Sequence, residues 1–140
     1  GGITTLPLGK GEVLREGSDL AIIAVGCTVH PALQAAQKLA DEGIGAKVIN
    51  ARFIKPLDAE LILNTAASIK KILTVEENVL DGGFGSAVLE LLAENGVTGA
   101  TVKRLGIRNQ FVEHAKPSEL RSSLGLDEEG ILQAAREYGR

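Results

Sequence analysis

The sequence contains few aromatic residues: three Phe, one Tyr and no Trp among 140 positions. A hydrophobic core must therefore come from Val, Ile, Leu and Ala, which suits a parallel sheet covered by helices. Cysteine is almost absent as well. The single thiol, Cys27, excludes an internal disulfide framework and fits a reducing compartment.

Long hydrophobic runs and an excess of positive charge are also missing. No uninterrupted apolar stretch approaches the roughly 20 residues of a membrane span, and the first residues lack the basic and then apolar profile of a secretory signal. The formal net charge is -3, so the chain has no excess of Lys and Arg. Non-specific binding of nucleic acid or anionic lipid needs such an excess. We therefore expect no nucleic acid and no membrane as partners, and a cytoplasmic location.

The rest of the composition is that of one globular domain. Hydrophobic residues make up 44% of the chain and charged residues 24%, which is too apolar for intrinsic disorder. No internal linker, low-complexity tract or repeat divides the sequence. Residues 1–140 are therefore predicted to form a single domain, with residues 1–9 as a linker or an artificial end.

Short apolar runs alternate with segments of helical spacing along the chain. Strands are predicted over residues 19–26, 44–51, 70–77 and 100–107, and helices over residues 28–43, 58–68, 84–95, 116–125 and from residue 127 onwards. This alternation predicts an α/β fold with three layers, in which helices cover both faces of a mixed, mostly parallel sheet of about five strands.

Individual residues mark where these elements begin and end. Pro31 fits a first helical turn, Gly43 and Gly96 can supply left-handed stops, and Asp58 is a predicted helix N-cap. A hydrophobic staple from Leu126 is expected at the cap of the last helix. One apolar helix face is predicted to consist of Ala32, Ala35, Ala36, Leu39 and Ala40.

Residues 9–17 are predicted to form one further strand. Only Glu16 to Ser18 separate this segment from the strand over residues 19–26. Because so short a connection suits a hairpin, the first strand is predicted to pair antiparallel with that second strand.

A glycine-rich loop follows the strand over residues 70–77. Its glycines precede a helix whose free amides would favour an anion such as phosphate. However, carboxylates flank the loop, no Lys or Arg lies between Lys71 and Lys103, and "GGFGSA" differs from the dinucleotide-binding spacing. We interpret the loop as a tight strand-to-helix turn. Its candidates for a loop or interface role are Glu76, Glu77, Asp81, Gly82, Gly83, Gly85 and Ser86.

Cys27 and His114 could take part in chemistry, but a structural role is the preferred interpretation for each. Cys27, with His30 three residues on, could be a nucleophile, but a buried small residue at a strand end is the preferred interpretation. His114 follows Glu113 and is interpreted as a solvent-facing or interface histidine. Two distant histidines give no zinc site.

Two cations follow the second parallel strand. Arg52 and Lys55 could clamp an anion, although solvated ends of a loop that covers the core are preferred. No serine-histidine-aspartate set, P-loop or acid/base pair is present in the sequence. We therefore expect no catalytic, cofactor-binding or metal-binding residues in this chain.

Five segments nevertheless resemble a known family. In order, "PLGKGEVLREG", "NARFIKPLDAELI", "ILTVEENVLDGGFGSAVLELL", "RLGI…QFVEH" and "LGLDEEGI" are similar to the C-terminal transketolase-like domain of 1-deoxy-D-xylulose-5-phosphate synthase. The resemblance covers nearly the whole chain. The sequence departs from the family at Arg108 and Asn109, where Pro and Asp are frequent, and at Cys27, where a small residue such as Thr often stands.

The resemblance implies one domain of an enzyme that condenses pyruvate with glyceraldehyde 3-phosphate and releases carbon dioxide. Thiamine diphosphate with Mg²⁺ supplies the carbanion chemistry in that family, and other domains hold the cofactor. The G-D-G motif of the metal ligands is missing here. The resemblance thus implies a noncatalytic domain that packs against the rest of its chain and supports a homodimer, in a bacterium or alternatively a plastid.

Two other functions stay open on sequence grounds. The chain could be the partner-docking C-terminal domain of a 2-oxoacid dehydrogenase β subunit, because "RFIKPLD" is similar to segments of those enzymes too. It could also be a stand-alone module that binds a small ligand or nucleotide through the glycine loop.

Overall fold

The computed structural model describes residues 9–52, 56–77, 83–107 and 128–138. A helix over residues 128–138 is the last element of this part of the chain. The other elements, in chain order, are β1 (Glu12–Arg15), β2 (Leu20–Ala24), η1 (Gly26–Thr28), α1 (Val29–Asp41), β3 (Ala46–Asn50), α2 (Ala59–Ser68), β4 (Lys71–Glu77), α3 (Gly83–Glu94) and β5 (Thr101–Ile107).

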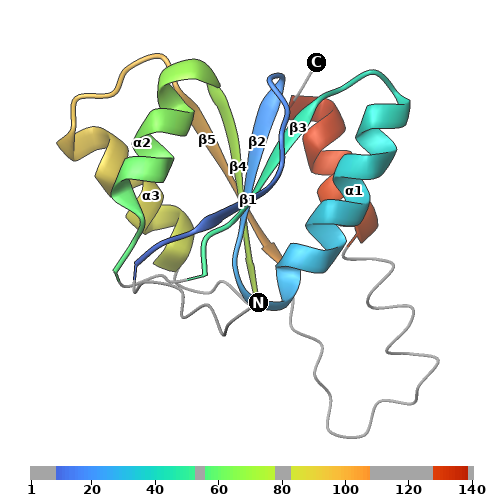
Figure 1. Ribbon diagram of the computed structural model, residues 1–140, viewed down its shortest axis with the longest axis horizontal. Helices are drawn as coiled ribbons and strands as arrows, with labels where there is room; N and C mark the ends of the chain where they lie inside the picture. The colour runs from blue at the N-terminus through green and yellow to red at the C-terminus, as the bar shows by residue number, and fades with distance from the viewer. Residues whose placement is uncertain (1–8, 53–55, 78–82, 108–127, 139–140) are drawn as a thin grey trace, which may run out of the picture.

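The strands form one five-stranded sheet in the order β1-β3-β2-β4-β5. β3, β2, β4 and β5 run parallel, and β1 is antiparallel to β3. Figure 1 shows α2 and α3 on one side of the sheet and α1 with the C-terminal helix on the other. The predicted three-layer α/β fold with a mixed sheet of five strands is confirmed.

The predicted partner of the first strand is wrong. β1 pairs with β3, with Glu12 opposite Asn50 and Val13 opposite Ile49. β2 has no free edge for a hairpin partner, because β3 and β4 occupy its two sides. β1 instead occupies the outer edge of β3.

The connection from β1 to β2 crosses the beginning of β3. At the crossing, a Cβ on Gly17 would lie 2.5 Å from the carbonyl carbon of Ala46, so no side chain fits. Asp19 then fixes the chain by two hydrogen bonds with Gly45: its backbone N–H donates to the Gly45 carbonyl at 2.9 Å, and its Oδ2 accepts from the Gly45 N–H at 2.6 Å.

Alternation along the central strands builds two hydrophobic clusters. In β2, Leu20, Ile22 and Ala24 belong to the cluster under α1 and the C-terminal helix. Ala21 and Ile23 belong to the cluster under α2 and α3. All five are fully buried, as the double coverage of a parallel sheet requires.

Most of the predicted helix signals are confirmed. Pro31 lies in the first turn of α1, and Gly43 and Gly96 follow their helices with φ of 82° and 65°. Ala40 is exposed, so its place on the buried face of α1 is wrong. At about 100° per residue it is rotated about 80° from Ala32, on the flank of the helix. The predicted helix over residues 116–125 and the Leu126 staple lie outside the described residues.

Charged side chains attach the C-terminal helix to α1. Arg136 donates from Nε and Nη2 to both carboxylate oxygens of Glu42, at 2.6–2.9 Å. Lys38 Nζ lies 2.9 Å from Glu128 Oε1. Within the described ranges, no helix combines the length and the apolar character needed to cross a membrane.

Candidate functional site at the carboxyl edge of the sheet

The topology singles out one position at the carboxyl edge of the sheet. From β2 the chain passes through α1 to β3 on one side, and from β4 it passes through α3 to β5 on the other. The adjacent strands β2 and β4 therefore continue in opposite directions. Open α/β sheets place ligands at such a switch point, because the two diverging connections leave a crevice there.

The ends of β2 and β4 are joined by hydrogen bonds at this position. The Val25 N–H donates to the Val75 carbonyl at 3.2 Å. The Thr28 hydroxyl, which is buried, lies 3.1 Å from the same carbonyl and accepts from the Val25 N–H at 3.1 Å. The turn that leads into α1 is thereby held against the end of β4.

Glu77, the last residue of β4, reaches across to the same turn. Its Oε1 accepts a hydrogen bond from the Cys27 N–H at 3.0 Å. Gly26, immediately before, has a φ of 68°, and a Cβ there would lie 3.1 Å from that oxygen. The glycine therefore permits both the left-handed turn and the close approach of the carboxylate.

Glu76, the preceding residue, faces the other side of the sheet and binds the start of α3. Its Oε1 accepts from the Phe84 N–H at 3.2 Å and its Oε2 from the Gly85 N–H at 2.6 Å. The residue is only 8% exposed. The carboxylate thus satisfies two of the unpaired amides of the helix and lies at the positive end of its dipole.

Close packing continues behind these amides. A Cβ on Gly85 would lie 2.6 Å from Cγ of Arg104 and 3.0 Å from the buried Oγ1 of Thr74. Arg104 on β5 extends past this glycine and donates from Nη1 to the Ser86 hydroxyl at 3.2 Å. Gly85 in "GGFGS" therefore permits close contact between α3 and the sheet. The predicted tight turn before it lies mostly outside the described residues.

The other predicted residues are distributed differently. Asp81, Gly82, His114 and Lys55 lie outside the described residues, and Gly83 is exposed at the start of α3. The expectation that Cys27 is buried is wrong: it is exposed, because η1 leaves the sheet at the edge. His30 is exposed too.

Arg52 has an unusual backbone conformation. It follows β3 at the same edge with a φ of 64°, which few residues other than glycine adopt. Its N–H donates to the Asn50 side-chain oxygen at 3.0 Å, and its guanidinium lies 3.9 Å from Glu12 of β1. These contacts attach Arg52 to Asn50 of β3 and Glu12 of β1.

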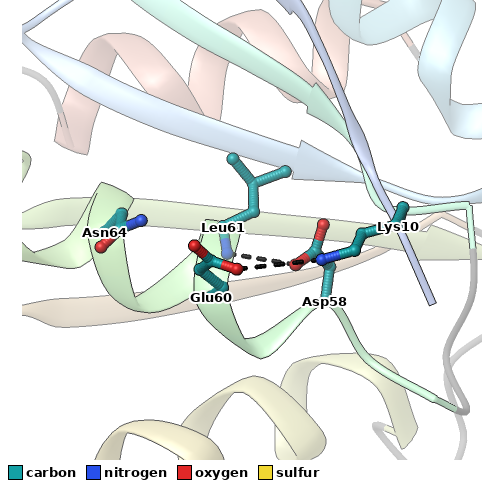
Figure 2. Close-up of a pocket in the computed structure, with 5 residues that line it drawn as sticks. All are labelled: Lys10, Asp58, Glu60, Leu61 and Asn64. Atoms are coloured by element: carbon teal, nitrogen blue, oxygen red, sulfur yellow. Dashed lines mark hydrogen bonds and ion pairs between the residues drawn. The ribbon is translucent and has the colours of Figure 1, made fainter.

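The structure also contains a shallow pocket of about 200 Å³ between Lys10, just before β1, and α2. Figure 2 shows its lining residues, Lys10, Asp58, Glu60, Leu61 and Asn64. Asp58 is the confirmed N-cap of α2 and accepts from Leu61 N–H at 3.1 Å. Its Oδ2 also accepts from the Gly11 N–H at 2.8 Å, a contact that no sequence signal predicted. In the part of the chain that the structure describes, no cluster of His, Cys, Asp or Glu could hold a metal ion.

Comparison with known families identifies the domain. Residues 9–131 match the family described as Transketolase, C-terminal domain. The chain belongs to this family. Glu76, Glu77, Gly85 and Arg104 all lie within the matched range of this transketolase C-terminal domain.

The curated relatives indicate which kind of enzyme within this family the chain resembles. The 1-deoxy-D-xylulose-5-phosphate synthase of Syntrophus aciditrophicus is 63% identical over 94% of this chain and 20% of its own length. Synthase 1 of Geobacter sulfurreducens is 58% identical over 95% of this chain and 21% of its own length. The resemblance to this synthase is confirmed, and the chain spans about a fifth of the length of these relatives.

Solved structures agree with the fold. A split-gene transketolase, described as an "inactive beta4 tetramer", has a TM-score of 0.78 and 34% identity over 97% of this chain and 43% of that chain. A transketolase from Pichia stipitis has a TM-score of 0.58 at 19% identity, over 94% of this chain and 18% of that one, which supports the fold alone.

Proposed function

We propose that this chain is the C-terminal domain of a 1-deoxy-D-xylulose-5-phosphate synthase, which joins pyruvate to glyceraldehyde 3-phosphate. The observation that carries the proposal is the 63% identity to such a synthase across 94% of the chain. The 140 residues form one domain of that longer enzyme, in the cytoplasm of a bacterium.

The cofactor of the proposed enzyme belongs to its other domains. Thiamine diphosphate would need amides or cations for its diphosphate and carboxylates for Mg²⁺. The described residues do not fit this group, because Glu76 and Glu77 occupy the amides at the start of α3 and at Cys27. The role of this domain is therefore structural: it packs on the other domains and supports a homodimer.

A domain exchange tests the proposal. In the Syntrophus aciditrophicus synthase, this chain would replace the matching 132 residues, and the control chimera would carry the C-terminal domain of a 2-oxoacid dehydrogenase β subunit. We expect the first chimera to form the sugar phosphate with kcat within about threefold of the parent, because most domain contacts are kept. A folded but inactive first chimera, or equal activity in both, would argue against the assignment.

The noncatalytic role has its own test. The isolated chain, given pyruvate, glyceraldehyde 3-phosphate, thiamine diphosphate and Mg²⁺, should release no carbon dioxide above the rate without protein. Turnover by the chain alone would contradict this role. Retention of a lipoyl-bearing acyltransferase by the immobilised chain would favour the dehydrogenase alternative instead.

The homodimer is tested in the full-length synthase. Gly83 is exposed and Ser86 partly exposed at the start of α3, so they remain our candidates for a contact with a neighbouring domain or subunit. Ser86→Trp should weaken the dimer in sedimentation, whereas Glu90→Gln, an exposed change farther along α3, should leave it intact. Equal dimer stability in both variants would remove this face from the interface.

A further inference from the structure

The carboxyl edge of this sheet is arranged like a ligand site but contains the chain's own anions. Glu77 lies at the switch point between β2 and β4, and Glu76 lies at the start of α3. In open α/β proteins generally, ligands bind at the switch point of the sheet, and phosphate groups bind at helix N-termini. Here three backbone N–H groups at the edge already donate to carboxylate oxygens.

We propose that Glu76 and Glu77 exclude phosphate-bearing ligands from this edge by occupying the amides that would bind them. The mechanism is direct occupancy and not charge repulsion alone. Each backbone N–H provides a single proton, and the contacts of 2.6–3.2 Å are hydrogen bonds that a phosphate oxygen would have to displace.

The packing around the carboxylates supports occupancy. Glu76 is 8% exposed, so a phosphate oxygen can reach Phe84 N–H and Gly85 N–H only after that side chain has left. Gly26 leaves just enough space for Glu77, since even a Cβ there would lie 3.1 Å from its Oε1. Both carboxylates are thus built into their positions.

Two pairs of variants separate occupancy from repulsion. Glu77→Ala removes the charge and empties the position, whereas Glu77→Gln removes the charge and keeps a side-chain oxygen near the Cys27 N–H. Glu76→Ala and Glu76→Gln form the matching pair at α3. Each 140-residue protein would be titrated with inorganic pyrophosphate without metal, and the amide resonances of Cys27, Phe84 and Gly85 would be followed by NMR.

Occupancy predicts that only the alanine variants gain binding. Their dissociation constants should fall about tenfold or more below that of the wild type, because charge-assisted hydrogen bonds become available. The glutamine variants should stay within about twofold of the wild type.

Several results would overturn the proposal. If Gln and Ala variants gain equally, repulsion is the cause. If no variant gains, or if the wild type already shows saturable shifts at these amides, the carboxylates exclude nothing. Glu77 is less buried than Glu76, so the Glu77 pair decides the test should Glu76→Ala fail to fold. The result concerns this chain alone and is independent of the proposed synthase activity.

Discussion

Gly17 shows how a single missing side chain fixes the topology. The chain must pass over the start of β3 here, and a Cβ would lie 2.5–2.7 Å from backbone atoms of Gly45 and Ala46. Backbone atoms in a sheet cannot move aside as a flexible side chain can. We therefore expect Gly17→Ala to lower the free energy of unfolding by about 3 kcal/mol, measured by urea denaturation.

Gly130 is the matched control for this prediction. It lies in the C-terminal helix, and apart from its chain neighbours and the backbone of that helix no heavy atom lies within 4 Å of a Cβ built there. Because alanine favours a helix over glycine, Gly130→Ala should raise stability by up to about 1 kcal/mol. A Gly17→Ala protein as stable as the wild type would mean that the backbone at this crossing can move apart to admit a side chain.

The paired glutamates show which part of a site the sequence can predict. Their charge next to the glycine loop was enough to disfavour phosphate. The amides that the two carboxylates bind were not predictable. The two side chains point to opposite faces of the sheet, and the Cys27 amide that Glu77 binds lies 50 positions away in the sequence. The one available signal was that two consecutive carboxylates end a strand at the edge where two helices begin.

At the scale of elements, Asp58 connects β1 to α2. One oxygen caps the helix at Leu61 N–H, and the other accepts from Gly11 N–H just before β1. Asp58→Ala should therefore lower the free energy of unfolding by about 2 kcal/mol in urea denaturation, more than the loss of an ordinary N-cap. The substitution leaves two backbone N–H groups without their acceptor, at a residue that is only 8% exposed.

Glu60 provides the control within the same helix. Its carboxylate pairs with Lys10 at 3.8 Å, and both side chains are mostly exposed. Glu60→Gln should change stability by less than about 0.5 kcal/mol, because exposed ion pairs contribute little. Equal losses in the two variants would show that the helix end, and not the link to β1, determines the cost.

The attachment of the C-terminal helix should depend on pH. The hydrogen bond and charge of Glu128 raise the pKa of Lys38 above its ordinary value of 10.5. A raised pKa in the folded state means that the pair contributes fully below pH 10.5 and is lost as the pH rises through the folded value. The stability difference between wild type and Lys38→Gln should therefore shrink above pH 10.5 in urea titrations.

Lys38→Arg separates this titration from general alkaline unfolding. The guanidinium keeps its charge well above the range in which lysine titrates. The arginine variant should therefore keep its advantage over Lys38→Gln at a pH where the wild type has lost it. If the stability advantage over Lys38→Gln declines with pH in parallel for the wild type and Lys38→Arg, groups other than Lys38 cause the pH dependence.

The order of elements was predictable from sequence, whereas the position of β1 was not. Apolar runs of strand length and helical spacing gave β2 to β5 and α1 to α3 within a few residues. The partner of β1 depends on which strand edges are already occupied, and that depends on the pairing of β2 with both β3 and β4. The short connection between β1 and β2 predicted a hairpin, because the local sequence does not show that β3 and β4 already occupy both edges of β2.

At the scale of the whole molecule, one sheet supports both hydrophobic clusters. Successive residues of β2 and β4 alternate between the cluster under α1 and the cluster under α2 and α3. Neither cluster can lose its packing without exposing the same strands. The two faces should therefore unfold together, even though their helices lie on opposite sides of the sheet (Figure 1).

The single tyrosine allows this cooperativity to be measured from one face. Tyr138 packs partly buried against the α1-side cluster, and its hydroxyl is hydrogen-bonded with that of Thr101. Ile72 is fully buried in the opposite cluster. Ile72→Val should lower stability by about 1 kcal/mol and shift the urea midpoint of Tyr138 fluorescence as much as that of far-UV circular dichroism. A shift in circular dichroism that leaves the Tyr138 midpoint in place would show two independent folding units, because the loss of packing under α2 and α3 would not have reached the other face.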